Sequence, residues 1–98
     1  MRGSWRDLEK WFSKEVFGYE SIVMSFAHDY RQAFRILYKF KKWKWTLEYD
    51  PDDGMFEMRL NDVFVKANDI PKAIALAAYK YLSRIDWVYE PSGFERAK

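Results

Sequence analysis

The side chain best suited to proton transfer in this sequence is His28, the single histidine of the chain. Imidazole often serves as a general acid or base near neutral pH, but it needs a nucleophile or an orienting carboxylate within hydrogen-bonding distance. The adjacent Asp29 does not meet this need, because consecutive residues of a helix point in different directions. We therefore interpret His28 as a structural residue in the first turn of a helix.

A second group of chemically capable side chains is the acidic run Asp50, Asp52 and Asp53, which is followed by Gly54. Calcium-binding loops of the EF-hand type place glycine at the sixth position and glutamate at the twelfth. Counted from Asp50, glycine stands at the fifth position here and Asn61 at the twelfth. Because the run is dense in turn-forming residues, it predicts a hairpin turn and no metal site.

Composition excludes several other kinds of site. The chain has no cysteine, which removes disulfides and thiolate chemistry, and one histidine does not make a multi-histidine metal site. We find no glycine-rich phosphate loop, paired catalytic carboxylates or nucleophile elbow, so we expect no enzymatic activity and no cofactor. No apolar run reaches the ~20 residues of a membrane span, and the N-terminus lacks a signal-peptide core, so we expect a cytoplasmic protein without membrane contact.

Charge is distributed unevenly along the chain. Residues 1–45 carry ten Lys/Arg and five Asp/Glu, net +5, whereas residues 46–98 carry seven and ten, net −3. Four basic residues recur at helical spacing on one predicted helix face: Arg31, Arg35, Lys39 and Lys42. This face is either a solvated helix surface or a surface that binds an anionic partner, and in the second case arginines should dominate the contact. Phe64 interrupts an otherwise polar strand face and is a further candidate binding residue.

Hydrophobic periodicity divides the chain into six elements. Apolar residues at helical spacing predict helices over residues 5–17, 28–41 and 69–85, with caps at Ser4 and at Asn68 or Asp69. Alternating residues predict strands over 43–49, 56–60 and 63–66, joined by short turns. We expect one domain over residues 1–90 and a flexible C-terminal tail over 91–98.

The predicted fold class is α+β, in the order α-α-β-β-β-α, with a three-stranded antiparallel meander. Polar residues occupy the outward strand positions, which predicts that the helices pack mainly on one face of the sheet in two layers. Eight residues should be buried together in the core: Phe34, Leu37, Trp45, Leu47, Phe56, Met58, Ile74 and Ala77.

Four stretches of the sequence resemble the phage ABA sandwich domain, a family of small phage and prophage proteins. Residues 15–19 (Glu-Val-Phe-Gly-Tyr) are similar to its "E-K-V-x-G-W" helix end, and residues 29–34 to its "S-T-D-I…A-W" helix start. Residues 45–60 stand where its hairpin stands, and residues 69–78 resemble its "D-T-P-x-A-I-C-x-A-A" helix. The family's cysteine is replaced by Leu76 or a neighbour, and its Ser-Thr cap by Ala27-His28. The family's name implies three layers, which leaves the layer number open.

The resemblance brings no catalytic residues. It implies an accessory protein in the host-cell cytoplasm that binds a host or phage protein or a small anionic ligand, with counter-defence as one role. A structural or assembly component is an alternative. Self-association is also an option, because a three-stranded meander has two open edges.

The α-β-β-β-α order is shared with double-stranded RNA-binding domains, so a nucleic-acid-binding module is another alternative. Those domains open their last helix with a cluster of lysines, whereas this helix opens with Asp69 and Lys72 after an acidic hairpin. Trp43 and Trp45 alternate with Lys42 and Lys44, which places rings and charges on opposite strand faces. Nucleic acid is therefore not the expected partner.

Overall fold

The computed structural model describes residues 2–97 of the chain. Its helices are α1 (Trp5–Trp11), continued by the π-helical segment η1 (Phe12–Val16), α2 (Tyr30–Lys39) and α3 (Ile70–Ser83). Its strands are β1 (Arg2–Ser4), β2 (Trp45–Asp50), β3 (Met55–Leu60), β4 (Val63–Ala67), β5 (Trp87–Glu90) and β6 (Gly93–Arg96). Met1 and Lys98, which the expected domain and tail include, lie outside the described residues.

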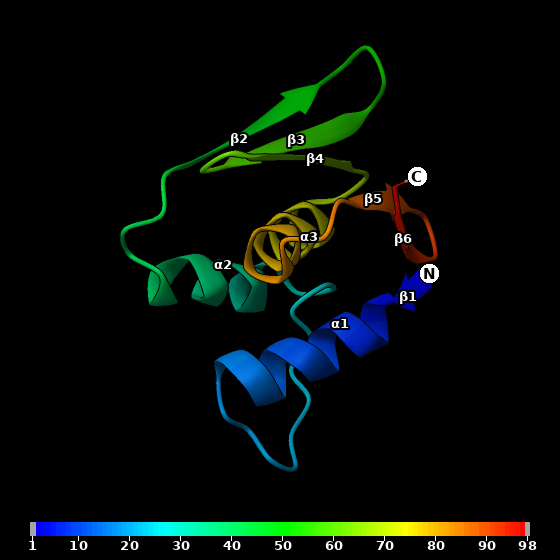
Figure 1. Cartoon of the computed structure of the whole chain (residues 1–98). Helices are drawn as coiled ribbons and strands as arrows, with labels where there is room; N and C mark the ends of the chain where they lie inside the picture. The colour runs from blue at the N-terminus through cyan, green and yellow to red at the C-terminus, as the bar shows by residue number, and fades with distance from the viewer. Residues whose placement is uncertain (1, 98) are drawn as a thin grey trace.

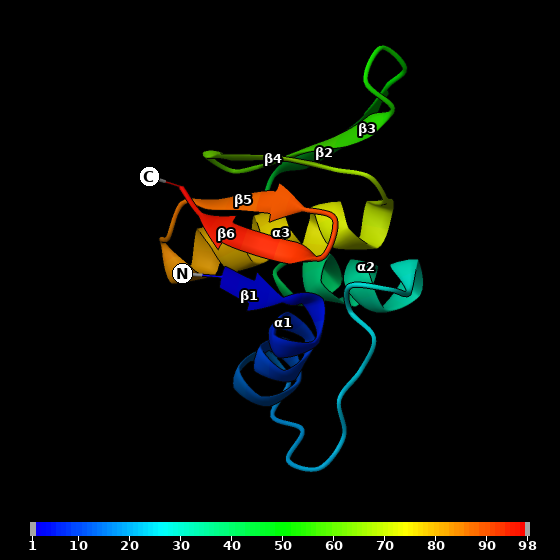
Figure 2. The same cartoon turned by 90° about the vertical axis from the view of Figure 1, so that its right-hand side faces the viewer.

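The strands form two antiparallel sheets of three strands each, in the orders β2-β3-β4 and β1-β6-β5. Figure 1 shows the β2-β3-β4 meander above α2 and α3, with α1 below these two helices. Figure 2 shows the second sheet beside α3, where it joins the two ends of the chain. The mixed α/β class and the meander are confirmed. The expected order is incomplete, because it lacks β1, β5 and β6.

Local sequence signals set where the helices begin and end. The side chains of Ser4, Asp29 and Asp69 accept hydrogen bonds from the backbone N–H groups of α1, α2 and α3, respectively. Such caps satisfy N–H groups that have no partner inside the helix. Gly18 has a φ of 71°, the left-handed conformation that glycine adopts freely. These caps match the sequence-based bounds to within two or three residues.

The predicted flexible tail is wrong for residues 93–96, which form β6 and pair with both β1 and β5. Its anchor is Phe94, which is buried among aromatic residues of α1, α3 and β5. The two chain ends also approach closely, since a Cβ added at Gly93 would lie 2.0 Å from the carbonyl oxygen of Gly3. The segment is ordered because Phe94 is buried and because Gly93, which has no side chain, lets β6 lie close to β1.

The core lies between the meander and the helices, and only part of the expected list is fully buried. Leu37, Met58, Ile74 and Ala77 are buried, whereas Phe34, Leu47 and Phe56 are half-buried. The placement of Trp45 in the buried core is wrong, because this side chain is 38% exposed. β2 is an edge strand, so among residues 2–97 no strand pairs with it on the side away from β3 and Trp45 is covered there less completely. No helix within the described residues has the length and apolarity to cross a membrane.

Candidate functional site

The predicted basic face of α2 is divided in the structure. Arg31 is exposed at the start of the helix and lies 3.6 Å from the carboxylate of the capping Asp29. Arg35 is half-buried, which corrects the expectation of a fully exposed face. Its guanidinium donates to the Tyr19 hydroxyl and the Gln32 side chain and lies over the Phe17 ring. The two arginines are thus engaged within the molecule.

The C-terminal end of α2 leads into a run of exposed lysines. We name this group the lysine cluster, and it consists of Lys39, Lys41, Lys42 and Lys44. None of the four has an ion-pair partner among residues 2–97. The negative end of the α2 dipole favours cations here, but it does not neutralise four charges. Lys39 and Lys42 of the predicted face therefore lie in a site that also includes Lys41 and Lys44.

A hollow of about 360 Å³ lies within the lysine cluster and is lined by residues 39–43. Its apolar wall is formed by Phe40 and Trp43, whose rings stack with centroids 4.1 Å apart. The Trp43 N–H donates to the Phe40 carbonyl at 3.0 Å, which closes the turn after α2. Trp43 also meets the Tyr81 ring of α3 edge-on. The hollow thus combines a rigid aromatic wall with cationic side chains.

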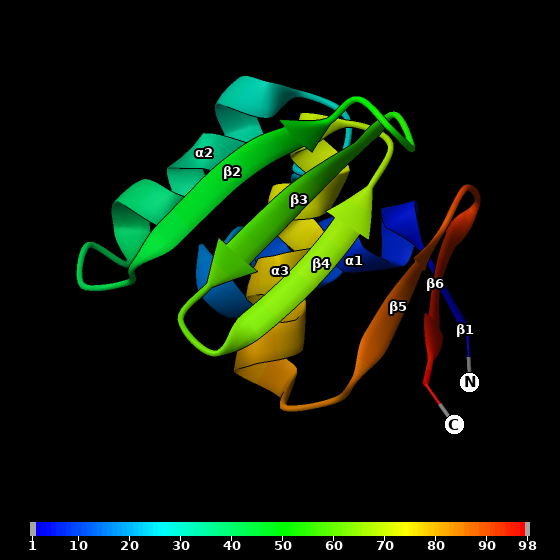
Figure 3. The same ribbon diagram turned by 90° about the horizontal axis from the view of Figure 1, so that it is seen from above.

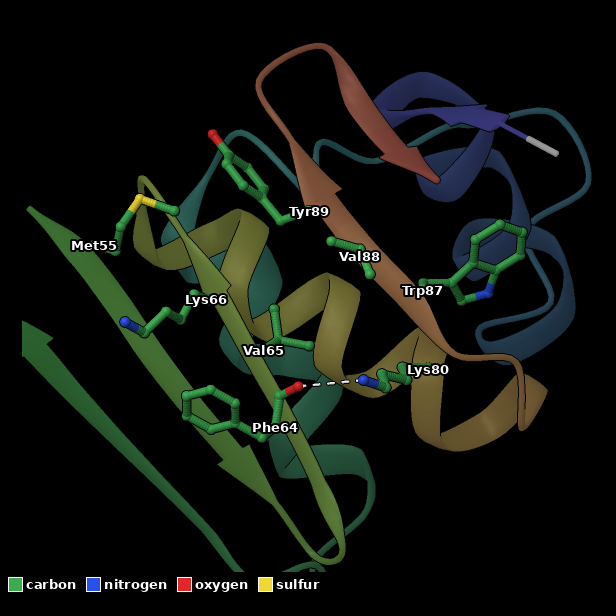
Figure 4. Close-up of a pocket in the computed structure, with 8 residues that line it drawn as sticks. All are labelled: Met55, Phe64, Val65, Lys66, Lys80, Trp87, Val88 and Tyr89. Carbon is green, nitrogen blue, oxygen red and sulfur yellow. Dashed lines mark hydrogen bonds between the residues drawn. The ribbon is translucent and has the colours of Figure 1, made fainter. Parts of the chain in front are cut away.

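Phe64, the fifth candidate residue, lies on β4 and belongs to a different surface. Its ring is 37% exposed, lies under the Arg59 guanidinium, and borders a cleft of about 260 Å³ between β4 and β5. Figure 4 shows Lys80 of α3 reaching across this cleft, where its Nζ donates to the Phe64 carbonyl at 3.4 Å. Lys80 Nζ also lies 2.7 Å from the Asp86 carboxylate. The charge at the base of this cleft is already neutralised.

Three carboxylates of the acidic hairpin are likewise compensated within the molecule. Lys66 Nζ lies within 3.7 Å of carboxylates of Asp50, Asp53 and Glu57. The hydrogen bond from Lys66 lowers the pKa of Asp53, and the same bond raises the pKa of Lys66. Asp50 and Asp53 also accept backbone N–H bonds within the turn. These contacts fit the predicted hairpin turn.

His28 has the carboxylate partner that the sequence interpretation lacked. Its Nδ1 lies 2.9 Å from Oε2 of Glu9, a residue of α1 that is only 2% exposed. The same oxygen accepts the Ala27 N–H, and Arg6 lies 3.6 Å from the other oxygen. The contact between His28 and Glu9 thus connects α1 with the segment that precedes α2. The position of Glu9 next to Leu8 on the apolar side of α1 was the available signal for this buried role.

No group of three or more His, Asp or Glu side chains that could hold a metal ion occurs in the described part of the chain. Comparison of the sequence and structure with protein-family models, curated proteins and solved structures found no match. The candidate site therefore has to be judged on its geometry and charge. On both counts, the lysine cluster with its aromatic hollow is the strongest candidate.

Proposed function

We propose that this protein is a non-enzymatic binding protein that recognises an acidic partner protein through the lysine cluster. The observation that supports this function is that four cations close together in the sequence have no carboxylate partner among residues 2–97. Lys66, Lys72 and Lys80 each have one, and the unpaired Lys10 and Lys14 belong to no such run. Like charges held close together repel, and an incoming anionic group removes that repulsion.

The aromatic wall of the hollow strengthens the case for a macromolecular partner. Phe40 and Trp43 are held by their mutual stacking and by the turn bond between them. Rigid aromatic residues often anchor protein interfaces, since they bury a large area and lose little conformational entropy. A small anionic ligand would use the lysines but not this apolar wall.

The charges around the site favour a short acidic segment over a long polyanion. Glu48 and Asp52, which form no ion pair among residues 2–97, lie on β2 and in the hairpin beyond it, toward the other end of the strand from Lys44. A nucleic acid that continued along β2 would meet these carboxylates, and phosphates are repelled by them. An acidic stretch of a protein can end before it reaches them.

The resemblance to the phage ABA sandwich family supplies a context for this proposal. We include in it an accessory role in a phage or prophage, with a host protein as partner and counter-defence as the biological use. The binding proposal itself rests on the lysine cluster and does not depend on that context.

The test is a binding measurement with a defined acidic probe. The probe is a fluorescein-labelled hexaglutamate peptide, measured by anisotropy against the protein and against the triple variant Lys41→Glu, Lys42→Glu, Lys44→Glu. A matched control reverses Lys10, Lys14 and Arg96, three exposed cations that have no ion-pair partner among residues 2–97.

We expect the cluster variant to lose about 10-fold or more in affinity and the control to stay within about 2-fold. Equal losses in the two variants would show that only net charge matters, and would refute the proposal. Tighter binding of a thymidine oligonucleotide of equal charge would also refute it, in favour of a nucleic-acid-binding module.

A further inference from the structure

β2 is an edge strand of the meander, and its backbone groups indicate what could bind there. The Lys44 carbonyl accepts a hydrogen bond from the Asn61 N–H at 2.8 Å. The backbone N–H and C=O groups of the even-numbered residues of β2 therefore point toward β3 and form hydrogen bonds with it. Residues of an antiparallel strand alternate in the direction of their backbone groups. Trp45, Leu47 and Tyr49 therefore direct three N–H and three C=O groups toward the open edge.

Helix α2 extends beyond this edge. Figure 3, viewed from above, shows α2 lying outside the line of β2. The two elements touch, since the rings of Phe34 and Trp45 have centroids 5.9 Å apart. Tyr38, whose ring stacks with Phe34, is 67% exposed, and Tyr49, further along β2, is 56% exposed. A strand added to β2 would therefore lie over α2 and cover aromatic surface that is now exposed.

The charges at the two ends of β2 set the direction and composition of such a strand. Lys42 and Lys44 precede the strand, whereas Glu48 and Asp52 lie near its far end. In an antiparallel pair, the added segment ends next to Lys44 and begins next to the acidic hairpin. A free C-terminal carboxylate and acidic residues before it then meet the lysine cluster and its hollow. A parallel segment would place its own C-terminus against the acidic hairpin.

The projecting helix argues against a second copy of the chain as the occupant. If β2 paired with β2 of another copy around a two-fold axis, the two α2 helices would be brought under the same pair of strands. Adjacent strands are about 4.8 Å apart, but packed helices need about 8–10 Å between axes. A peptide strand without its own helix avoids this conflict.

From these observations we propose that the open edge of β2, together with α2 beneath it, binds the acidic C-terminal tail of a partner protein as an added antiparallel strand. Main-chain hydrogen bonds to Trp45, Leu47 and Tyr49 would supply the pairing, and the lysine cluster would fix the orientation. This inference rests on the proposed function, because the same lysines hold the acidic end of the tail.

The experiment uses a fluorescein-labelled peptide of alternating valine and threonine that ends in two glutamates with a free carboxylate. A second peptide carries N-methyl groups on the amides that would face β2, and a third carries them on the opposite amides. A fourth has the reversed sequence, with its C-terminus amidated. All four are titrated against the unchanged protein, so that no variant has to fold.

We expect the peptide methylated toward β2 to bind about 10-fold or more weakly than the parent, because it has lost its edge hydrogen bonds. The peptide methylated on the other side should stay within about 2-fold, and the reversed peptide should be weakened several-fold. Equal binding of both methylated peptides would overturn strand addition. If the lysine-cluster variant still lost hexaglutamate binding, the proposed function would stand without it.

Sedimentation of the free protein tests the alternative occupant. We expect a monomer at the concentrations used for binding. A dimer that dissociates when the parent peptide is added would show that a second copy occupies the β2 edge, and would overturn the choice of a partner tail.

Discussion

Replacing Phe94 by alanine tests whether the C-terminal segment is part of the core. Phe94 is 3% exposed, and its ring centroid lies 5.1–5.7 Å from those of Trp5, Tyr79 and Trp87. Burying a side chain of this size is worth about 1.5–3 kcal/mol, and each aromatic pair adds about 0.5–1.5 kcal/mol. Because contacts of one ring are not independent, we expect a loss of about 3–5 kcal/mol, the usual range for buried phenylalanine.

The matched control is the same substitution at Phe64, whose side chain is 37% exposed. Urea unfolding followed by tryptophan fluorescence gives both free energies of unfolding. A domain of this size loses about 4–8 °C in Tm per kcal/mol, so Phe94→Ala should lower Tm by at least about 12 °C. If the two variants differed by less than about 0.5 kcal/mol, the C-terminal segment would not be packed, and the account of the second sheet would be wrong.

Three further predictions concern the rest of the core. Glu9→Ala leaves the Ala27 N–H buried without its acceptor, so we expect a loss of about 1–3 kcal/mol in urea unfolding. A loss below about 0.5 kcal/mol would exclude the structural role of the pair. Ala77→Trp overpacks the fully buried α3 surface and should cost about 1–3 kcal/mol or more, whereas an unchanged Tm would contradict the packing. Burial raises the pKa of Tyr79, so its contribution to stability is complete below the unfolded pKa and is lost as pH rises through the folded one. Burial raises the pKa of Tyr89 as well, so spectrophotometric titration should show two late-titrating tyrosinates, one of which disappears in Tyr79→Phe; the persistence of both would refute the assignment.

The main helices and the meander could be predicted because their residues carry strong local signals. Alternation from Trp45 to Tyr49 and the turn residues after Asp50 predicted the first hairpin, and the capping residue Asp69 predicted the start of α3. These signals depend only on residues that are close together in the sequence. Their success does not require knowledge of how distant segments pack.

The second sheet could not be predicted for the opposite reason. β1 has three residues and β6 has four, and charged residues such as Arg2 and Glu95 interrupt any apolar pattern. Their pairing joins opposite ends of the chain and depends on the close approach of Gly3 and Gly93, which the local sequence does not reveal.

The candidate site was partly visible in the sequence. The density of lysines at the end of α2 was evident, but their state of pairing depends on the fold. Lys66 is surrounded by carboxylates from the hairpin, while Lys42 has none within reach in the described residues. Arg35 seemed equivalent to its neighbours at helical spacing, yet the segment containing Tyr19 folds back and binds it. Long-range contacts of this kind decide which charges are left for a partner.

Amide hydrogen exchange, measured by NMR on the protein saturated with the valine–threonine–glutamate peptide, tests the central claim most directly. We predict that the amides of Trp45, Leu47 and Tyr49 exchange about 10-fold or more slowly in the complex. The amides of Thr46 and Glu48 already pair with β3 and should change little. Unchanged exchange at the three edge amides, with the peptide bound, would contradict strand addition at β2.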